Sequence, residues 1–152
     1  MTAIKKALTL TLALALCLTA FGALAERDKP LVGIIQIADH VALDAARQGF
    51  LDALSENGYV DGETVTIDYR NAQGSPDILA SIADHFVSEQ VDMVLAIATP
   101  SAQAMAGKTD SIPILGTAIT DYVVARLAES NEVPGYNVSG TTDMNPVQLQ
   151  IE

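Results

Sequence analysis

The sequence is poor in the residues that build thiol, aromatic and basic sites. It has one cysteine, no tryptophan and only 5% aromatic residues among its 152. Lys and Arg number 8 against 19 Asp and Glu, which gives a net charge of −11. This sign argues against nucleic acids and anionic lipid surfaces as partners, because both repel an acidic protein. Hydrophobic residues make up 49% of the chain, enough for a packed core, and the length predicts one domain, alone or with a processed segment.

The N-terminus has the pattern of a secretory signal peptide. Lys5 and Lys6 precede an apolar stretch over 7–16, and Ala-Leu-Ala at 23–25 has the small residues of a cleavage site. The alternative is a membrane anchor, but the apolar stretch is shorter than the roughly 20 residues that span a bilayer. We therefore predict a signal peptide over 1–25, with no membrane span after its removal and with export to the periplasm or the extracellular face.

Cys17 raises a second alternative, a lipoprotein signal. Leu16 stands directly before it, where lipidation favours a small residue, so a lipid anchor at Cys17 is the less favoured reading. Removal of residues 1–25 takes away two lysines and no acids, which changes the net charge from −11 to −13. It also removes the thiol, and this excludes disulfides, cysteine nucleophiles and Cys-ligated zinc in the mature chain.

The mature chain alternates apolar runs with amphipathic stretches. Strands are predicted at 31–37, 64–70, 92–98 and 112–117, and helices at 41–57, from Ser75-Pro76 onward, and from Thr99-Pro100 to about 107. The second helix has an apolar stripe that includes Ile78 and Phe86. This order implies right-handed crossovers, so we predict an α/β fold, a three-layer parallel sheet with helices on both faces.

The pattern loosens after Thr117. A short helix over 123–128 and a short strand over 135–142 are predicted. Residues 146–152 resemble the first turns of a helix without its remainder, so we expect the chain to be incomplete.

In parallel α/β sheets, ligands bind beyond the carboxyl ends of the strands. Thr99 and Ser101 begin a helix there, and with Pro100 they predict free N–H groups at positions 101 and 102 that favour an anion such as a carboxylate. The alternative is that Thr99 only caps its own helix.

Two further loops reach the same edge of the sheet. Thr120-Asp121 follows the fourth strand, and its carboxylate can pair with an ammonium group, so the two loops together predict a site for an amino-acid zwitterion. The alternative for Asp121 is a turn or helix cap. His40 follows the first strand and either lines the cleft or is an ordinary surface residue.

Motifs for catalysis or cofactor binding are missing. Gly107-Lys108-Thr109 resembles the end of a phosphate-binding loop but follows a helix instead of starting one, and position 102 is Ala where that motif has Gly. No G-x-G-x-x-G follows the first strand, only His40 and His85 could offer imidazole, and no Ser-His-Asp set stands at motif spacing. We expect no cofactor, no metal and no enzyme activity.

Several strings together are similar to the ABC-transporter substrate-binding family that includes tryptophan- and tyrosine-binding lipoproteins, from about residue 31 to 152. They are Val-Gly-Ile-Ile-Gln (32–36), Asp-His (39–40), Ala-Leu-Asp-Ala-Ala-Arg-Gln-Gly-Phe (42–50), Glu-Asn-Gly-Tyr (56–59), Tyr-Arg-Asn-Ala-Gln-Gly (69–74), Ala-Ile-Ala-Thr-Pro-Ser-Ala-Gln (96–103), Thr-Asp (120–121), Pro-Gly-Tyr-Asn-Val-Ser-Gly-Thr (134–141), Asp-Met (143–144) and Pro-Val (146–147).

The resemblance implies a type I periplasmic-binding fold, with two α/β lobes that close on a ligand and deliver it to an ABC permease. It implies that residues 99–101 and 120–121 line the cleft beside Gln36 and His40, and that the ligand is a small, plausibly aromatic, amino-acid-like molecule. Since family members carry a second lobe, residues 26–152 would be a truncated first lobe. The alternatives are a complete small exported enzyme or sensor lobe and a nonfunctional truncated fragment.

Overall fold

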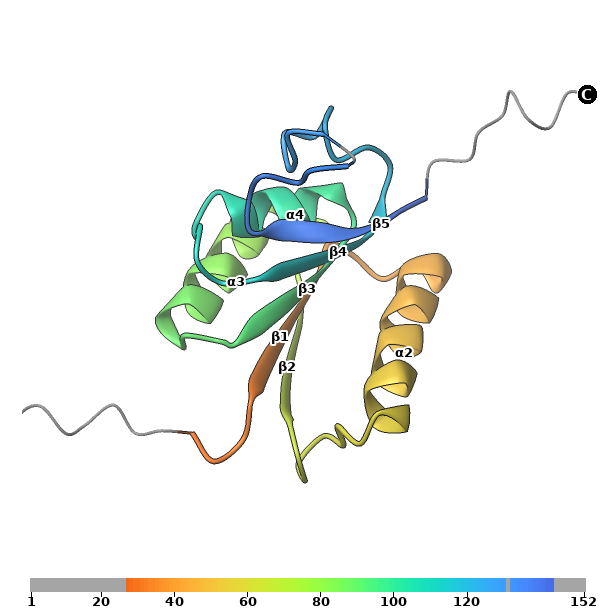
Figure 1. The fold of residues 1–152 in the computed structure, drawn as a ribbon, viewed down its shortest axis with the longest axis vertical. Helices are drawn as coiled ribbons and strands as arrows, with labels where there is room; N and C mark the ends of the chain where they lie inside the picture. The colour runs from red at the N-terminus through yellow and green to blue at the C-terminus, as the bar shows by residue number, and fades with distance from the viewer. Residues whose placement is uncertain (1–26, 131, 144–152) are drawn as a thin grey trace, which may run out of the picture.

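The alternating runs of the sequence form strands and helices in the computed structural model, which describes residues 27–130 and 132–143 (Figure 1). The predicted α/β class is confirmed, with some shifts at the ends of elements. The strands are β1 (Leu31–Gln36), β2 (Thr66–Asn71), β3 (Met93–Ile97), β4 (Ile114–Ile119) and β5 (Val138–Thr142), and the helices are α2 (Val41–Glu56), α3 (Pro76–Ser88) and α4 (Thr99–Ala106).

All five strands are parallel, in the order β2-β1-β3-β4-β5. In this register Gln36 at the end of β1 lies beside Asn71 of β2 and Ile97 of β3. Ile97 in turn lies beside Thr117 of β4. The last residues of β1 to β4 and the loops that follow them therefore share one edge of the sheet, which we call the carboxyl edge.

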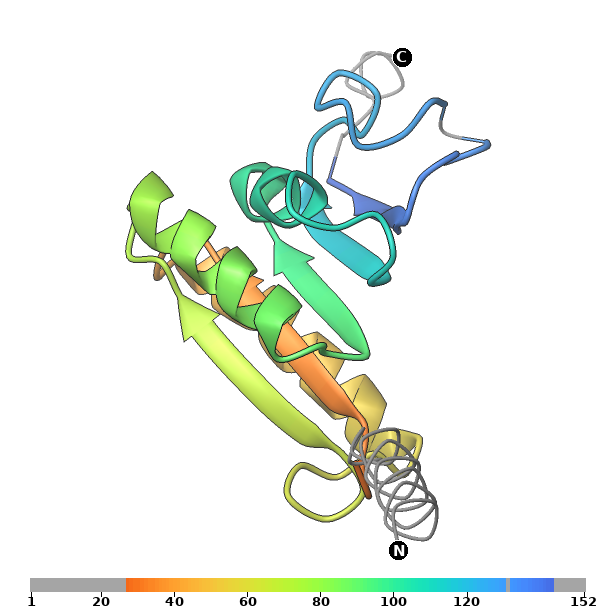
Figure 2. The same ribbon diagram turned by 90° about the vertical axis from the view of Figure 1, so that its left-hand side faces the viewer.

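The sheet has α3 and α4 on one face and α2 on the other, as Figure 2 shows with α3 and α4 in front and α2 behind. The first face carries the larger apolar core. Helix α3 begins as predicted, with the Ser75 hydroxyl accepting from the Ile78 N–H at 3.3 Å and Pro76 as its first residue. Its buried residues are Leu79, Ile82, Ala83 and Phe86, whereas Ile78, predicted in the stripe, is 43% exposed because the first turn directs it outward.

Gly33 of β1 allows α3 to approach the sheet closely. A Cβ at this position would lie 2.9 Å from two atoms of the Phe86 ring, closer than carbon atoms pack. Because Phe86 has no exposed surface, the ring occupies the space that a side chain at position 33 would need. The glycine is thus explained by packing of the helix on the sheet.

The face under α2 has a smaller core. Buried Ile34, Leu95 and Ile97 contact partly buried residues that include Phe50 and Leu51 of α2. No residue of α2 itself is fully buried. The helix therefore covers this face more loosely than α3 and α4 cover the opposite one.

Residues 123–126 form turns and residues 127–128 are not helical, so the predicted short helix is wrong. Arg126 has φ +59°, in the left-handed region that a right-handed helix cannot use. The N–H groups of Leu127 and Ala128 both donate to the carbonyl of Tyr122, instead of to the carbonyl four residues back. The short strand predicted over 135–142 is confirmed as β5.

Two predictions fall outside the described residues: the signal peptide over 1–25 and the helical start at 146–152. Within the described part of the chain, no helix combines the length and apolar character needed to cross a membrane.

Candidate functional site

Gln36 lies beneath the first loop of the carboxyl edge and has no exposed surface. Its Nε2 donates to the Ala38 carbonyl and to Asp44 Oδ1, each at 2.8 Å. Its Oε1 has no hydrogen-bond partner among the described residues. The side chain therefore ties the 37–40 loop to the first turn of α2 and leaves one buried acceptor unused.

His40 is the N-cap of α2 and lies exposed at the carboxyl edge. Its Nδ1 accepts from the Ala42 N–H at 3.2 Å, so the ring has a capping function whatever else it contacts. The adjacent Asp39 accepts from Asn71 Nδ2 at 2.6 Å, which links the loop after β1 to the end of β2.

Helix α4 begins through an unusual backbone turn at Ala98. This residue has φ +75° and ψ +154°, a region that is almost confined to glycine and costs on the order of 1–3 kcal/mol. Ala98, and not Thr99, is the N-cap, which corrects the alternative in which Thr99 caps its own helix. The N–H groups of Ser101 and Ala102 donate to the Ala98 carbonyl at 3.1 and 3.3 Å, so the prediction that they are free is also wrong.

The two hydroxyl residues of this turn differ in accessibility. Thr99 is partly buried. Ser101 is fully buried, and its Oγ has no partner among the described residues. An unpartnered buried hydroxyl is uncommon, since it costs about 1–3 kcal/mol.

Asp121 follows β4 and is held in a turn. Its Oδ1 accepts from the N–H groups of Val123 and Val124 at 2.9 and 2.8 Å, as the turn-capping alternative predicts. Thr120 is exposed, and its carbonyl accepts from Thr142 Oγ1 at 2.7 Å. The two bonds from Val123 and Val124 fix the direction of the Asp121 carboxylate through one of its oxygens only.

The strand order places these segments next to one another. Because β3 lies between β1 and β4, the turn at Thr99 is flanked by the Gln36–His40 segment and by Thr120-Asp121. Positive φ values recur along this edge, at Gln73, Ala98 and Ala118. The conformation of these three residues could not be predicted from the sequence, because neither alanine nor glutamine signals a left-handed backbone.

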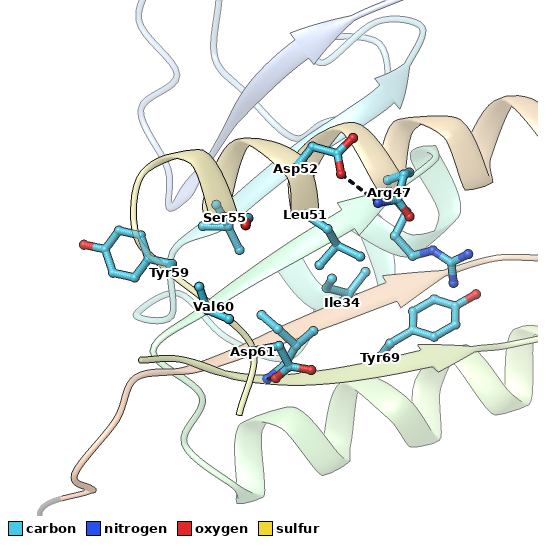
Figure 3. A pocket seen from close by; sticks show the side chains of 12 residues that line it. Ile34, Arg47, Leu51, Asp52, Ser55, Tyr59, Val60, Asp61 and Tyr69 are labelled. Atoms are coloured by element: carbon cyan, nitrogen blue, oxygen red, sulfur yellow. Dashed lines mark hydrogen bonds between the residues drawn. The ribbon is translucent and has the colours of Figure 1, made fainter. Parts of the chain in front are cut away.

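A crevice of about 480 Å³ lies elsewhere, between α2 and β2 (Figure 3). Ile34, Leu51 and Ile67 contribute apolar surface, and the guanidinium of Arg47 lies 4.0 Å from the centre of the Tyr69 ring. The crevice includes none of the six predicted site residues. Within the described residues there is also no group of three His, Cys, Asp or Glu side chains able to hold a metal ion.

Comparison with known proteins identifies the family. The family model described as ABC transporter substrate binding protein matches residues 31–152. The chain belongs to this family. The match begins at β1 and includes all the predicted site residues.

Similar proteins carry the same fold and sequence pattern. A tyrosine-binding protein of Clostridioides difficile is 47% identical over 121 residues, which are 80% of this chain and 35% of that protein. The ligand-free, open structure of a substrate-binding protein with adhesive properties from Clostridium difficile is 49% identical with a TM-score of 0.77, covering 78% of this chain and 40% of that one. A Streptococcus structure with L-Trp bound is 37% identical with a TM-score of 0.76, covering 80% and 41%.

The chain thus spans well under half the length of the relatives that it matches. These relatives are substrate-binding proteins. The resemblance that the sequence strings indicated is confirmed at the level of family and fold.

Proposed function

We propose that this chain is the first lobe of an extracytoplasmic solute-binding protein that captures an amino acid and delivers it to an ABC permease. The proposal includes removal of residues 1–25 as a signal peptide, a location in the periplasm or at the extracellular face, and a second lobe that closes over the ligand. It also holds that the protein releases its ligand chemically unchanged.

One observation carries the proposal: opposite electrostatic features stand at the ends of neighbouring strands. The N-terminus of α4, with its positive dipole end at Thr99, follows β3, and the Asp121 carboxylate follows β4. Adjacent strands lie about 4.8 Å apart. Groups at the ends of two such strands can therefore contact the carboxylate and the ammonium group of one amino-acid zwitterion. The buried oxygens of Gln36 and Ser101, which have no hydrogen-bond partner among the described residues, belong to the same edge, and this supports a polar ligand there.

The ligand class follows from this arrangement and from the relatives. A site with a partial positive charge on one side and a carboxylate on the other favours α-amino acids, and the tyrosine-binding and L-Trp-bound relatives favour an aromatic side chain. The low aromatic content of this chain means that apolar contacts to such a side chain are expected largely from the second lobe.

The direct test uses the product of the complete reading frame that contains this chain. Calorimetric titration with the twenty amino acids should give saturable binding of one or a few, and mass spectrometry should recover the ligand unaltered. Failure of every amino acid to bind would refute the ligand class, and chemical conversion of a bound ligand would refute the absence of catalysis.

The variant Asp121→Asn tests the ammonium contact. Asn can still accept from the N–H groups of Val123 and Val124, so the turn is retained while the charge is lost. We expect affinity to fall by roughly 10- to 100-fold, the range for a charge-assisted hydrogen bond. The matched control is Asp110→Asn, an exposed aspartate beyond the other end of α4, which should bind as the wild type does.

A further inference from the structure

Strand β4 bends just before it reaches the candidate site. Ala118 has φ +54°, and the pairing of β4 with β5 shifts register between Gly116 and Ile119. Such an irregularity weakens the ladder that would otherwise fix the end of a strand. The segment that follows the bend is Thr120-Asp121, and besides the Thr142 hydroxyl on the Thr120 carbonyl it depends on contacts of the turn itself.

The side chain of Tyr122 lies across this bend. Its hydroxyl donates to the Gly116 carbonyl of β4 at 2.8 Å and lies 3.1 Å from the Thr141 carbonyl of β5, so one hydrogen is shared between the two strands. Tyr122 is 8% exposed, and burial raises its pKa to about 12. The hydroxyl therefore keeps its proton at any physiological pH.

Two glycines make room for this tyrosine. A Cβ at Gly116 or at Gly140 would collide with the Tyr122 hydroxyl. The backbone of Tyr122 is anchored as well, since its carbonyl accepts from the N–H groups of Leu127 and Ala128 at 2.8 and 3.2 Å. Ring, hydroxyl and main chain of Tyr122 are thus all fixed, one residue after Asp121.

We propose that Tyr122 is a positioning residue of the ligand site: by joining β4 to β5 at the bend, it fixes the place of the turn whose own N–H groups orient the Asp121 carboxylate. This inference rests on the proposed function, in which Asp121 pairs with the ligand ammonium group. It assigns to Tyr122 no contact with the ligand. Loss of its hydroxyl should weaken recognition of the ammonium group more than recognition of the rest of the ligand.

The experiment measures selectivity in addition to affinity. For the wild type and Tyr122→Phe, made in the complete protein, dissociation constants are measured for L-tyrosine and for 3-(4-hydroxyphenyl)propionate, which lacks the ammonium group. L-Tryptophan and indole-3-propionate form a second pair. We expect Y122F to lower the preference for the amino acid by roughly 5- to 10-fold, the equivalent of about one hydrogen bond. Tyr136→Phe, which alters an exposed tyrosine of the neighbouring loop, should leave the preference unchanged.

Each outcome distinguishes the two proposals. A wild type that binds none of the amino acids refutes the proposed function. A wild type that prefers the amino acid, together with a Y122F variant that keeps the whole preference, refutes the positioning role alone. An equal loss of affinity for both members of a pair also refutes it, because a general loosening of the fold would act on both. If Y122F is unstable, the same ratio is measured with trimethylamine N-oxide, which favours the folded state.

Discussion

The two faces of the sheet are packed very differently. Helix α3 buries four residues against the sheet, and Phe86 touches the backbone of β1 so closely that only glycine fits at position 33. Helix α2 is longer, yet it has no fully buried residue, and a crevice of about 480 Å³ separates it from β2. Helix length is therefore a poor guide to the stability that a helix contributes, because buried apolar area and not the number of turns provides most of it.

The test with the largest expected effect truncates one phenylalanine on each face of the sheet. Phe86→Ala should reduce the free energy of unfolding by about 3–5 kcal/mol, the range for a fully buried ring. Phe50→Ala, on partly buried α2, should cost roughly half as much. Urea unfolding of both variants measures the difference, and equal losses would show that the two faces contribute alike.

Gly33→Ala tests the close contact on the dense face directly. The added methyl group has to displace the Phe86 ring, and overpacking of this kind costs about 1–3 kcal/mol. Phe86→Leu removes the ring. The double variant should therefore lose less stability than the sum of the losses in the two single variants. Strict additivity would contradict the contact.

Tyr122 belongs to the core of the dense face and predicts a pH dependence. Its pKa is raised by burial from 10.0 to about 12, so between these values the unfolded chain loses the proton while the folded protein keeps it. The stabilisation is complete below pH 10 and is lost as the pH rises toward 12, on the order of 2–3 kcal/mol in all. Alkaline unfolding curves of wild type and Tyr122→Phe should differ in slope only in that window. Identical slopes would show that the hydroxyl titrates normally.

The smallest expected effect is a gain on the loose face. Gly49 lies inside α2, and a Cβ there would meet no atom within 4 Å. Gly49→Ala should therefore stabilise the protein by about 0.5–1 kcal/mol, the helix propensity difference between the two residues. Thermal unfolding measures it as a small rise in Tm, and a fall would indicate contacts that α2 makes outside the described residues.

Much of this fold could be predicted from the sequence because its signals are local. Apolar runs marked the strands, and Ser75-Pro76 marked the start of α3. The segment at 123–128 could not be predicted, because its course depends on the Tyr122 carbonyl, which captures the N–H groups of Leu127 and Ala128. The periodicity of apolar residues does not show which carbonyl an N–H group will bond.

The candidate site was predicted as a set of loops but not as a geometry. Loops that follow parallel strands share one edge of the sheet, so the approach of the Thr99 and Asp121 segments could be expected. The glycine-like conformation of Ala98 could not be expected, because the surrounding structure imposes it. The two buried oxygens of Gln36 and Ser101 could not be foreseen either, because burial and partner choice are decided by tertiary contacts.

The left-handed backbone at Gln73, Ala98 and Ala118 has a consequence for protein engineering. Replacing such residues by glycine is a standard route to higher stability, because it relieves the strain. Here the same change would also widen the range of conformations open to the loops that carry Thr99 and Asp121. A variant stabilised in this way would be expected to lose affinity for its ligand as it gains heat resistance. The backbone conformation of these three residues would then set a trade-off between stability and activity.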